Sequence, residues 1–567
     1  MKLKYTVLIA VSALLSLTSC SDFLDQQPDN RIELNTEDNI IKLLVSAYPT
    51  GNYGWLGELS SDNIIDNNAP HYPANPSAAQ VLAKYNLAAY DRGDEELFRF
   101  EQVKSNTQQD SPDYIWESFY NGIATANHAL AAIDEYTKKH GGTMSAELTA
   151  AKGEALLIRA YSHFILVNLF SQAYKDDTNS KNDVGIPYIT SPEDKVLVNY
   201  DRGNVADVYA KIQNDLEAGL KLISDVNYKT APKYHFNVNA AHAFAARFYL
   251  FKHDYDKVIE HADAVLGTNP SAMLLDYTIF KDCVTGEDYI NRWHDPSVNN
   301  NLMLLSTSSI QQRRTTQTRF AFNGQPAKDI LFHRPGVYWG SGLNGCPTAF
   351  QDGSLFYSGS QDYGYIAMKV GEDFEYTDKV QGIGYPHLIR REFTATELLL
   401  ERIEAKILSK DKRNLSGAMD DILALIKSRQ SFSSEVVQQM TSYGMFMPTA
   451  EQVLSYYKQS TNPNCYSDWS FAKNMGVDVP AECVPYMNAV NDLRRMDHVM
   501  DGLRFFDLKR WGIEYSHFYG PNNVEYKLTW NDPRRAIEIP GDVMSAGLAT
   551  SRPAGELSGK NDEFIAK

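Results

Sequence analysis

The strongest constraint on the fold is a helical pattern at residues 248–270. Its centre reads Asp254-Tyr255-Asp256-Lys257-Val258-Ile259-Glu260, and it closes with Leu266 and Asn269-Pro270. Aromatic and small residues at this spacing let two antiparallel helices close against each other, and proline stops the second helix. One such pair cannot bury its apolar face alone, so the pattern predicts neighbouring helical pairs.

The pattern resembles half of a tetratricopeptide repeat, with His253 at the turn position where the repeat usually has glycine. Apolar residues at helical spacing predict the other helices, near residues 113–127, 148–170, 205–223, 239–266, 395–409, 418–428 and 486–511. The apolar stripe at 148–170 is wide enough to pack on both sides, and His163 within it is expected to be a satisfied core histidine. We therefore expect a mostly α fold, in which paired helices form one curved array.

The segment 271–391 breaks this pattern. Gly, Asn, Ser and Asp are dense there, and no sustained periodicity is present apart from a strand-like stretch at 302–305. Long irregular segments inside a regular domain are usually binding loops or disorder, and the high aromatic content argues against disorder. A loop-rich, aromatic-rich subdomain packed on the helices is therefore predicted, with a further loop at 443–485 and a coil tail after residue 511.

The first twenty residues predict export and lipid attachment. Met1-Lys2-Leu3-Lys4 is a short basic head, and the apolar run at 7–17 is too short to span a membrane permanently. Leu17-Thr18-Ser19-Cys20 is typical of a bacterial lipobox, where Cys20 is lipidated and becomes the first residue. Two or three acyl chains suffice for stable attachment, so we expect a chain anchored to the membrane by lipid alone.

Composition supports a folded protein, with 43% apolar and 22% charged residues. The predicted organisation is a signal peptide at 1–19, an N-terminal tetratricopeptide-like part at 20–270, a ligand-binding loop-rich part at 271–391, and C-terminal helices and tail at 392–567 that complete the same fold. The net charge is −17, and loss of Lys2 and Lys4 with the signal makes it −19. This balance argues against binding to nucleic acid or electrostatic adhesion to anionic lipid.

Four cysteines remain besides Cys20, at 283, 346, 465 and 483. None forms a CxxC pair or lies near a histidine at zinc spacing, so a structural zinc site is not expected. Cys465 and Cys483 flank a loop-like stretch and are able to form a disulfide in an oxidising compartment, but spacing alone leaves the question open. Whether the protein binds a structural calcium ion is an equally open question.

The motifs of known catalytic and cofactor sites are absent from the sequence. There is no HExxH motif, no GxSxG elbow, no phosphate-binding Gly-rich loop with Lys-Ser/Thr, and no GxGxxG after a strand. The 71 acidic residues make chance carboxylate pairs inevitable, so counting neither supports nor excludes a glycosidase. We expect a non-enzymatic protein without a cofactor.

Several segments resemble, in order, the SusD/RagB family of outer-membrane nutrient-binding lipoproteins. They are the lipobox at Cys20, Phe23-Leu24-Asp25, Ala155-Leu156-Leu157-Ile158-Arg159-Ala160-Tyr161, Leu169-Phe170 followed by Gly185-Ile186-Pro187, the repeat at 248–270, Arg494-Arg495-Met496-Asp497, Asp501-Gly502-Leu503-Arg504-Phe505-Phe506-Asp507-Leu508-Lys509-Arg510-Trp511-Gly512, and Ile537-Glu538-Ile539-Pro540. From the residues themselves, Arg504 and Asp507 are expected to pair on a helix whose other side buries Phe505, Leu508 and Trp511. We interpret this segment as structural.

The resemblance implies a surface-exposed, non-catalytic lipoprotein of the outer membrane. Such a protein captures an oligo- or polysaccharide and delivers it to a TonB-dependent transporter. Capture of peptides is the alternative within the same family, and a hydrolase with an unrecognised site or an assembly scaffold are alternatives of other classes.

Aromatic side chains are the candidate ligand contacts, because sugars stack their C–H faces on Trp and Tyr while polar groups take the hydroxyls. The candidates are Tyr53, Trp55, Trp293, Tyr338 and Trp339. We expect a shallow cleft formed by loops, since a polymeric ligand needs an open surface.

Overall fold

The computed structural model describes residues 34–70, 86–104, 106, 108–193, 200–316, 319–331, 356–360, 364–429 and 448–552. The signal peptide and Cys20 lie outside these residues. The described part is mostly helical, with a few small antiparallel sheets. None of its helices combines the length and apolar character that crossing a membrane requires.

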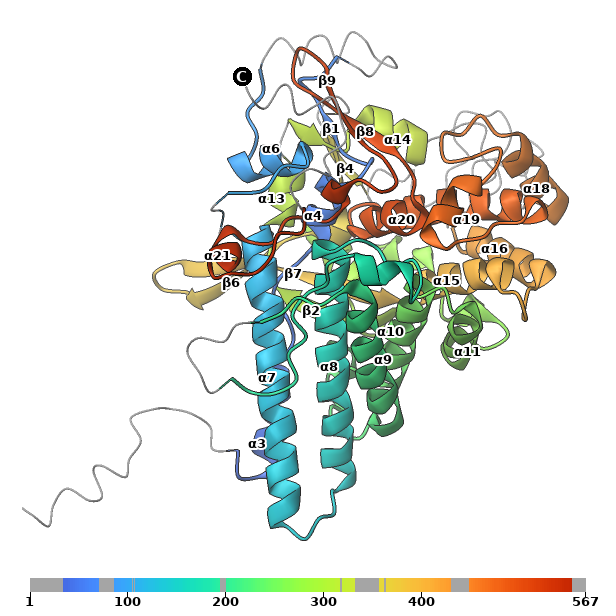
Figure 1. Cartoon of the computed structure of the whole chain (residues 1–567). Coiled ribbons are helices and arrows are strands. Elements are labelled where there is room, and N and C mark those ends of the chain that lie inside the picture. Colours follow the sequence, from blue (N-terminus) through green and yellow to red (C-terminus); the bar gives the residue numbers. More distant parts are fainter. Residues whose placement is uncertain are drawn as a thin grey trace, which may run out of the picture.

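Two long antiparallel helices, α7 (Pro112–Lys139) and α8 (Ala146–Phe170), form one side of the molecule (Figure 1). Each begins at a serine whose side chain accepts a backbone N–H of the first turn, Ser111 from Tyr114 and Ser145 from Leu148. Helix α8 is buried around almost its whole circumference, as the wide apolar stripe predicts. His163 on α8 is fully buried and accepts from the backbone N–H of Ile189 at 3.1 Å, so the prediction of a satisfied core histidine is confirmed.

Further helices pack as successive pairs beside α8, which confirms the tetratricopeptide-like array (Figure 1). They are α9 (Val205–Leu222), α10 (Val238–Phe251), α11 (Tyr255–Leu266), α15 (Ala395–Leu408) and α16 (Leu415–Ser428). His253, between α10 and α11, has a φ of 64°, the left-handed conformation that the glycine of a standard repeat adopts readily. The turn is therefore kept although the residue differs.

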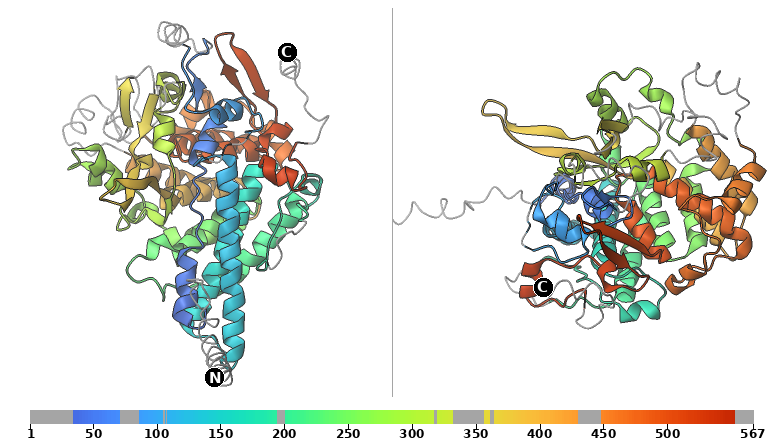
Figure 2. Two further views of the ribbon diagram at one scale, coloured as in Figure 1. Left: turned by 90° about the vertical axis from the view of Figure 1, so that its left-hand side faces the viewer. Right: turned by 90° about the horizontal axis from the view of Figure 1, so that it is seen from above.

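The middle segment contains more regular structure than the sequence predicts. Strands β2 (Asn301–Thr307), β7 (Ile383–Thr394) and β6 (Asp373–Asp378) form an antiparallel sheet in the order β2-β7-β6. The strand-like stretch at 302–305 lies in β2, as predicted. The expectation of irregular structure around it is wrong, because the outer part of β6–β7 is largely exposed among the described residues and a strand there needs no continuous apolar pattern. This ribbon projects from the body (Figure 2, right).

Three C-terminal expectations also need correction. The segment 443–485 includes a helix, α18 (Ala450–Gln459). The single helix expected at 486–511 is two helices, α19 (Val484–Asp497) and α20 (Leu503–Trp511), separated by Gly502 at a φ of 77°. The tail after residue 511 forms a hairpin of β8 (Tyr515–Tyr519) and β9 (Val524–Leu528).

Shorter elements complete the described chain. These helices and strands are α3 (Glu37–Val45), α4 (Gly54–Leu59), β1 (Ile65–Asp66), α6 (Arg92–Phe98), α12 (Gly286–Trp293), α13 (Gln311–Thr315), β3 (Phe320–Ala321), α14 (Gly324–Ile330), β4 (Phe356–Ser360), β5 (Gly364–Ala367) and α21 (Gly541–Ser545). The 3₁₀ helices are η1 (Asn179–Asn182), η2 (Pro232–Tyr234), η3 (Pro270–Ala272), η4 (Tyr277–Phe280), η6 (Met368–Val370), η7 (Ser470–Met475), η8 (Ala481–Cys483) and η9 (Pro533–Arg535).

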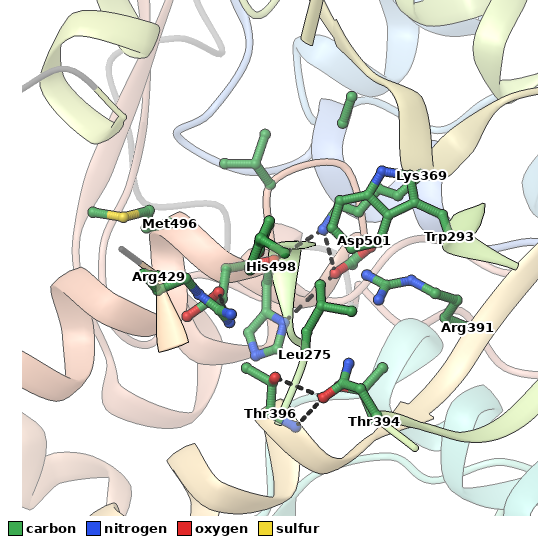
Figure 3. Close-up of a pocket in the computed structure, with 15 residues that line it drawn as sticks. Leu275, Trp293, Lys369, Arg391, Thr394, Thr396, Arg429, Met496, His498 and Asp501 are labelled. Carbon is green, nitrogen blue, oxygen red and sulfur yellow. Dashed lines mark hydrogen bonds and ion pairs between the residues drawn. The ribbon is translucent and has the colours of Figure 1, made fainter. Parts of the chain in front are cut away.

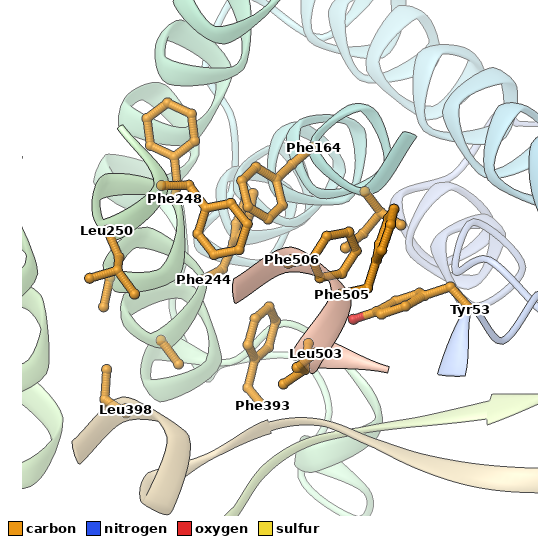
Figure 4. Close-up of a cluster of buried hydrophobic side chains, with 14 of the residues drawn as sticks. Tyr53, Phe164, Phe244, Phe248, Leu250, Phe393, Leu398, Leu503, Phe505 and Phe506 are labelled. Atoms are coloured by element: carbon orange, nitrogen blue, oxygen red, sulfur yellow. The ribbon is translucent and has the colours of Figure 1, made fainter. Parts of the chain in front are cut away.

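Aromatic side chains from distant parts of the sequence meet in one core (Figure 4). Phe164 of α8 and Phe244 of α10 pack with ring centroids 5.7 Å apart, and Phe393 at the end of β7 lies 6.0 Å from Phe244. Phe506 of α20 contacts Phe251 of α10 at 6.0 Å. The helical array, the middle sheet and the C-terminal helices therefore share a hydrophobic core.

Helix α20, from the segment that carries the family resemblance, is buried along its whole length. Asp507 accepts from Arg494 at 2.9 Å and from Arg510 at 2.8 Å. The predicted pairing of Arg504 with Asp507 is wrong: Arg504 instead binds Asp62 at 2.8 Å, because Arg494 and Arg510 already occupy the Asp507 carboxylate.

The cysteines in the described residues are free thiols, so Cys465 and Cys483 are not joined. Burial raises the pKa of Cys465 to about 12, which keeps it as the unreactive thiol at neutral pH. Cys346 lies outside the described residues. The described part of the chain also holds no group of three His, Cys, Asp or Glu side chains suited to a metal ion.

Candidate functional site

Two of the aromatic candidates are core residues. Tyr53 is fully buried, donates its hydroxyl to Glu392 at 2.8 Å, and is covered by the guanidinium of Arg390 at 3.7 Å from the ring centroid. Trp55 is 1% exposed and donates its Nε1–H to Asp94 at 2.8 Å. Neither ring offers a face to solvent, which corrects the expectation of a stacking surface at these positions. Tyr338 and Trp339 lie outside the described residues.

Trp293 lines a small pocket. It ends α12, is 6% exposed, and packs against Phe280 with ring centroids 4.8 Å apart. The Arg391 guanidinium covers its ring at 4.5 Å from the centroid. Its Nε1–H is buried and has no hydrogen-bond acceptor among the described residues. Trp293 is therefore a wall of a polar pocket rather than an exposed platform.

The pocket lies where several segments far apart in the sequence meet (Figure 3). Its walls include the end of α12, η6, the inner part of β7, and the turn between α19 and α20. The lining residues are Leu275, Tyr277, Trp293, Asn300, Ala367, Lys369, Arg391, Thr394, Thr396, Arg429, Met496, Asp497, His498, Val499 and Asp501. Its interior of about 30 Å³ holds one or two water molecules, so it admits a small polar group but no sugar ring.

Ion pairs fix most of the charged groups around the pocket. Lys369 donates to Asp501 at 2.7 Å and to the backbone carbonyl of Asp497 at 2.9 Å. Burial lowers the pKa of Lys369, although Asp501 opposes that shift. Burial alone would raise the pKa of Asp501, but Lys369 and His498 together hold that pKa well below its usual range. Arg429 binds Asp497 through one carboxylate oxygen.

Buried polar atoms at the pocket include Trp293 Nε1, His498 Nε2 and Asp497 Oδ2, which have no hydrogen-bond partner among the described residues. His498 is 4% exposed and turns its other ring nitrogen toward Asp501 at 3.6 Å. Buried polar groups are rarely left unpaired, so the pocket is built to receive water or a polar ligand.

The β6–β7 ribbon carries exposed aromatic side chains that the sequence analysis missed. Phe374 and Tyr376 are 41% and 51% exposed, with ring centroids 4.9 Å apart. The residues opposite them across the ribbon are the small or compact Pro386 and Gly384, so both rings share a face that a ligand can reach. The alternation in Asp373-Phe374-Glu375-Tyr376 was the signal for this strand.

The ribbon and the pocket are continuous. Lys369 precedes β6 by four residues, and Arg391 lies four residues beyond His387, the partner of Asp373 at the base of the ribbon. At ~3.3 Å per residue, roughly 13 Å separate that base from Arg391. The aromatic face therefore lies outside the polar pocket on the same two strands.

A second depression of about 300 Å³ lies between α18, η7 and the start of α19. Tyr466, Trp469, Lys458 and Lys473 contribute to its walls. Trp469 is 1% exposed and donates its Nε1–H to Asn488, so its ring is committed to packing. Because its polar groups are more fully paired, this depression is the weaker candidate.

Residues 22–250 match a family model for SusD-like proteins that is described as starch-binding and associating with the outer membrane. No curated protein matched the chain. Solved structures share the fold over nearly the whole length. A SusD superfamily protein from Bacteroides vulgatus is 18% identical with a TM-score of 0.56, covering 92% of this chain and 99% of its own.

Two further structures carry functional descriptions. A SusD-like carbohydrate binding protein from Bacteroides vulgatus is 14% identical with a TM-score of 0.53, covering 92% of this chain and 98% of its own. Surface glycan-binding protein A from Bacteroides uniformis is also 14% identical with a TM-score of 0.53, covering 91% and 99% respectively. At these identities the structures establish the fold alone. The chain is therefore similar to SusD-like proteins over residues 22–250 and shares the fold of SusD superfamily structures over nearly its whole length.

Proposed function

We propose that this chain is a non-catalytic, lipid-anchored protein of the outer-membrane surface that captures a glycan. The description of the matching family model and the glycan-binding structures of the same fold support this function. The proposed anchor is a lipid on Cys20, and the proposed recipient of the glycan is a TonB-dependent outer-membrane transporter, as the family resemblance implies.

The observation that carries the proposal is the exposed aromatic face of the β6–β7 ribbon beside a polar pocket. Phe374 and Tyr376 offer apolar ring surface to the C–H faces of sugars, and the pocket at its base offers unpaired polar atoms. Rigid aromatic rings bind with little loss of conformational entropy, and an open ribbon admits a polymer. Tyr338 and Trp339, which lie outside the described residues, are proposed as further contacts.

Substitution of the ribbon aromatics tests this proposal. Each ring contact contributes ~0.5–1.5 kcal/mol beyond the area that it buries, so the double change Phe374→Ala with Tyr376→Ala should weaken glycan binding at least about tenfold. The melting temperature should stay unchanged because both rings are exposed. The matched control is Tyr136→Ala, a partly exposed tyrosine near the far end of α7.

Binding is measured on a glycan array and by calorimetry, with a peptide pool assayed in parallel. Glycan binding that needs Phe374 and Tyr376 supports the proposal. Binding to peptides alone would instead favour the peptide-capturing alternative, and release of shortened sugars from the bound glycan would identify a hydrolase. Tyr338→Ala and Trp339→Ala extend the same assay to the remaining candidates.

A further inference from the structure

Arg391 is a half-buried arginine that makes no ion pair with a carboxylate in the described part of the chain. Its guanidinium stacks on Trp293 at 4.5 Å, and no hydrogen bond or ion pair joins it to another described residue. Figure 3 shows the side chain entering the pocket from β7, on the side of Asp501 and His498. Burial lowers the pKa of Arg391, although the nearby Asp501 carboxylate opposes that shift.

Neighbouring arginines show how the same protein treats a buried guanidinium. Arg390, the preceding residue, binds Glu392 at 2.5 Å. Arg429, across the pocket, binds Asp497, and Arg510 in the core binds Glu404 through both carboxylate oxygens at 2.5 and 2.7 Å. Arg391, which is half-buried, departs from the pairing of these arginines, and it does so inside a pocket.

The charges around the pocket leave an excess of one positive charge. Lys369, Arg391 and Arg429 are cationic, and Asp497 and Asp501 are anionic. Asp501 is held by Lys369, and Asp497 is held by Arg429. The Nε1–H of Trp293 is a buried donor without an acceptor among the described residues. The guanidinium of Arg391 stacks on the same ring and makes no hydrogen bond or ion pair to a described residue. This set fits an anion that accepts several hydrogen bonds.

The size of the pocket limits the anion. An interior of about 30 Å³ holds one or two waters, which is the space that the two oxygens of a carboxylate fill. A pyranose ring does not fit, and a sulfate ester brings three terminal oxygens instead of two. The planar fork of Arg391 matches a carboxylate through two parallel hydrogen bonds. The free Oδ2 of Asp497 is then an acceptor for a hydroxyl of the same sugar.

We propose that this pocket binds the carboxylate of an acidic sugar residue, with Arg391 and Trp293 as its donors, while the rest of the glycan follows the aromatic face of the β6–β7 ribbon. This inference rests on the proposed glycan-binding function and names its ligand class: glycans that contain uronic acids. Arg391 is then the residue that distinguishes an acidic glycan from a neutral one.

The test uses the full chain purified in detergent. The probes are glucuronate, oligogalacturonate, carboxyl-reduced oligogalacturonate and a sulfated neutral oligosaccharide. The two uronate probes should raise the melting temperature of the wild-type chain, and oligogalacturonate should bind at least tenfold more tightly than its reduced form. Arg391→Met should abolish the preference, and Arg391→Lys should retain only part of it because lysine lacks the planar fork.

Arg292→Met is the matched control, since Arg292 is exposed, adjoins Trp293 and carries the same charge. It should bind the uronates as the wild type does. The melting temperature of each unliganded variant reports whether it is folded. If Arg391→Met does not fold, the comparison of wild type with Arg391→Lys still tests the inference.

Equal binding of uronates by the wild type and a folded Arg391→Met variant would overturn the inference, as would a failure of every uronate to bind. A preference for the sulfated probe would overturn the assignment to carboxylates. Binding of the reduced probe in these cases would leave the proposed glycan-binding function intact. Only a chain that binds no glycan of either kind contradicts the proposed function itself.

Discussion

Replacement of Trp511 by alanine should destabilise the protein strongly. Trp511 ends α20, is fully buried, and packs edge-on against Trp469 with ring centroids 5.4 Å apart. The guanidinium of Arg510 lies 4.1 Å from the centroid of its ring, and its Nε1–H donates to Glu404 at 3.1 Å. The substitution removes apolar packing, one cation–π contact and one hydrogen bond.

The cost follows mainly from the lost packing. A buried aromatic side chain removes ~200 Å² from water, which at ~25 cal/mol per Å² corresponds to roughly 5 kcal/mol. The alanine retained at this position reduces that figure, and substitutions of buried Phe or Trp by Ala cost ~3–5 kcal/mol. Glu404 keeps both hydrogen bonds to Arg510, so no buried carboxylate is left unpaired. We expect a loss of about 4 kcal/mol.

Thermal unfolding followed by circular dichroism measures this loss. For roughly 500 ordered residues the entropy of unfolding is about 1 kcal/mol per kelvin, so 4 kcal/mol lowers the melting temperature by about 4 °C if the chain unfolds as one unit. Trp511→Phe should lose less than half as much, and Trp530→Ala, at a partly exposed tryptophan, should lose little. A decrease below about 1 °C for Trp511→Ala would refute the assignment of this residue to the core.

The remaining predictions concern the anchor, a turn and a buried acid. Cys20→Ala should release or misplace the protein, and unchanged membrane association together with no lipid mass on the wild-type N-terminus would contradict lipidation. Gly502→Ala should cost at least ~2 kcal/mol, because a Cβ at φ 77° would lie 2.7 Å from the Gly54 carbonyl oxygen. Gly520→Ala, at φ 66° with open space around it, should cost only the ~1 kcal/mol of backbone strain. Equal melting temperatures for the two variants would contradict the steric explanation. Burial raises the pKa of Glu58 from 4.5 to about 7. Between these pH values the folded state holds a proton that the unfolded state has lost, so the free energy of unfolding should decrease as the pH rises from about 4.5 to 7. Glu58→Gln should flatten this dependence, and melting curves that differ from wild type by the same amount at pH 5 and pH 8 would show that Glu58 does not titrate in this range.

Local periodicity was sufficient to predict the helical array, because each repeat encodes its own turn and stripe. The segment 248–270 predicts α11 and its proline stop, and even the exceptional His253 keeps the left-handed turn. The break between α19 and α20 escaped prediction because the apolar pattern continues through it. Only the close approach of Gly502 to Gly54, 448 positions earlier in the chain, shows why the helix must end there.

The candidate site was predicted much less well. Loop-like sequence predicts exposed aromatic residues, but Tyr53 and Trp55 donate to the buried carboxylates of Glu392 and Asp94, which no local pattern reveals. The sequence predicts Trp293 as a stacking surface for sugars, whereas in the structure it is a wall of the pocket. Arg391 carries no motif, and its unpaired state is visible only once the partners of neighbouring charges are known.

The net charge of −17 bears on how such a protein binds an acidic glycan. At physiological ionic strength the Debye length is about 8 Å, so most carboxylates on the surface are screened from an anion inside the pocket. The groups that act on it are those lining the same cavity, where Lys369 and Arg429 each form an ion pair with an aspartate and Arg391 forms none. A guanidinium without an ion pair in a small cavity selects a carboxylate that is presented at the right place. Recognition then depends on geometry. An anionic glycan gains no binding energy from the acidic surface, and only a sugar whose carboxylate reaches Arg391 is bound in the pocket.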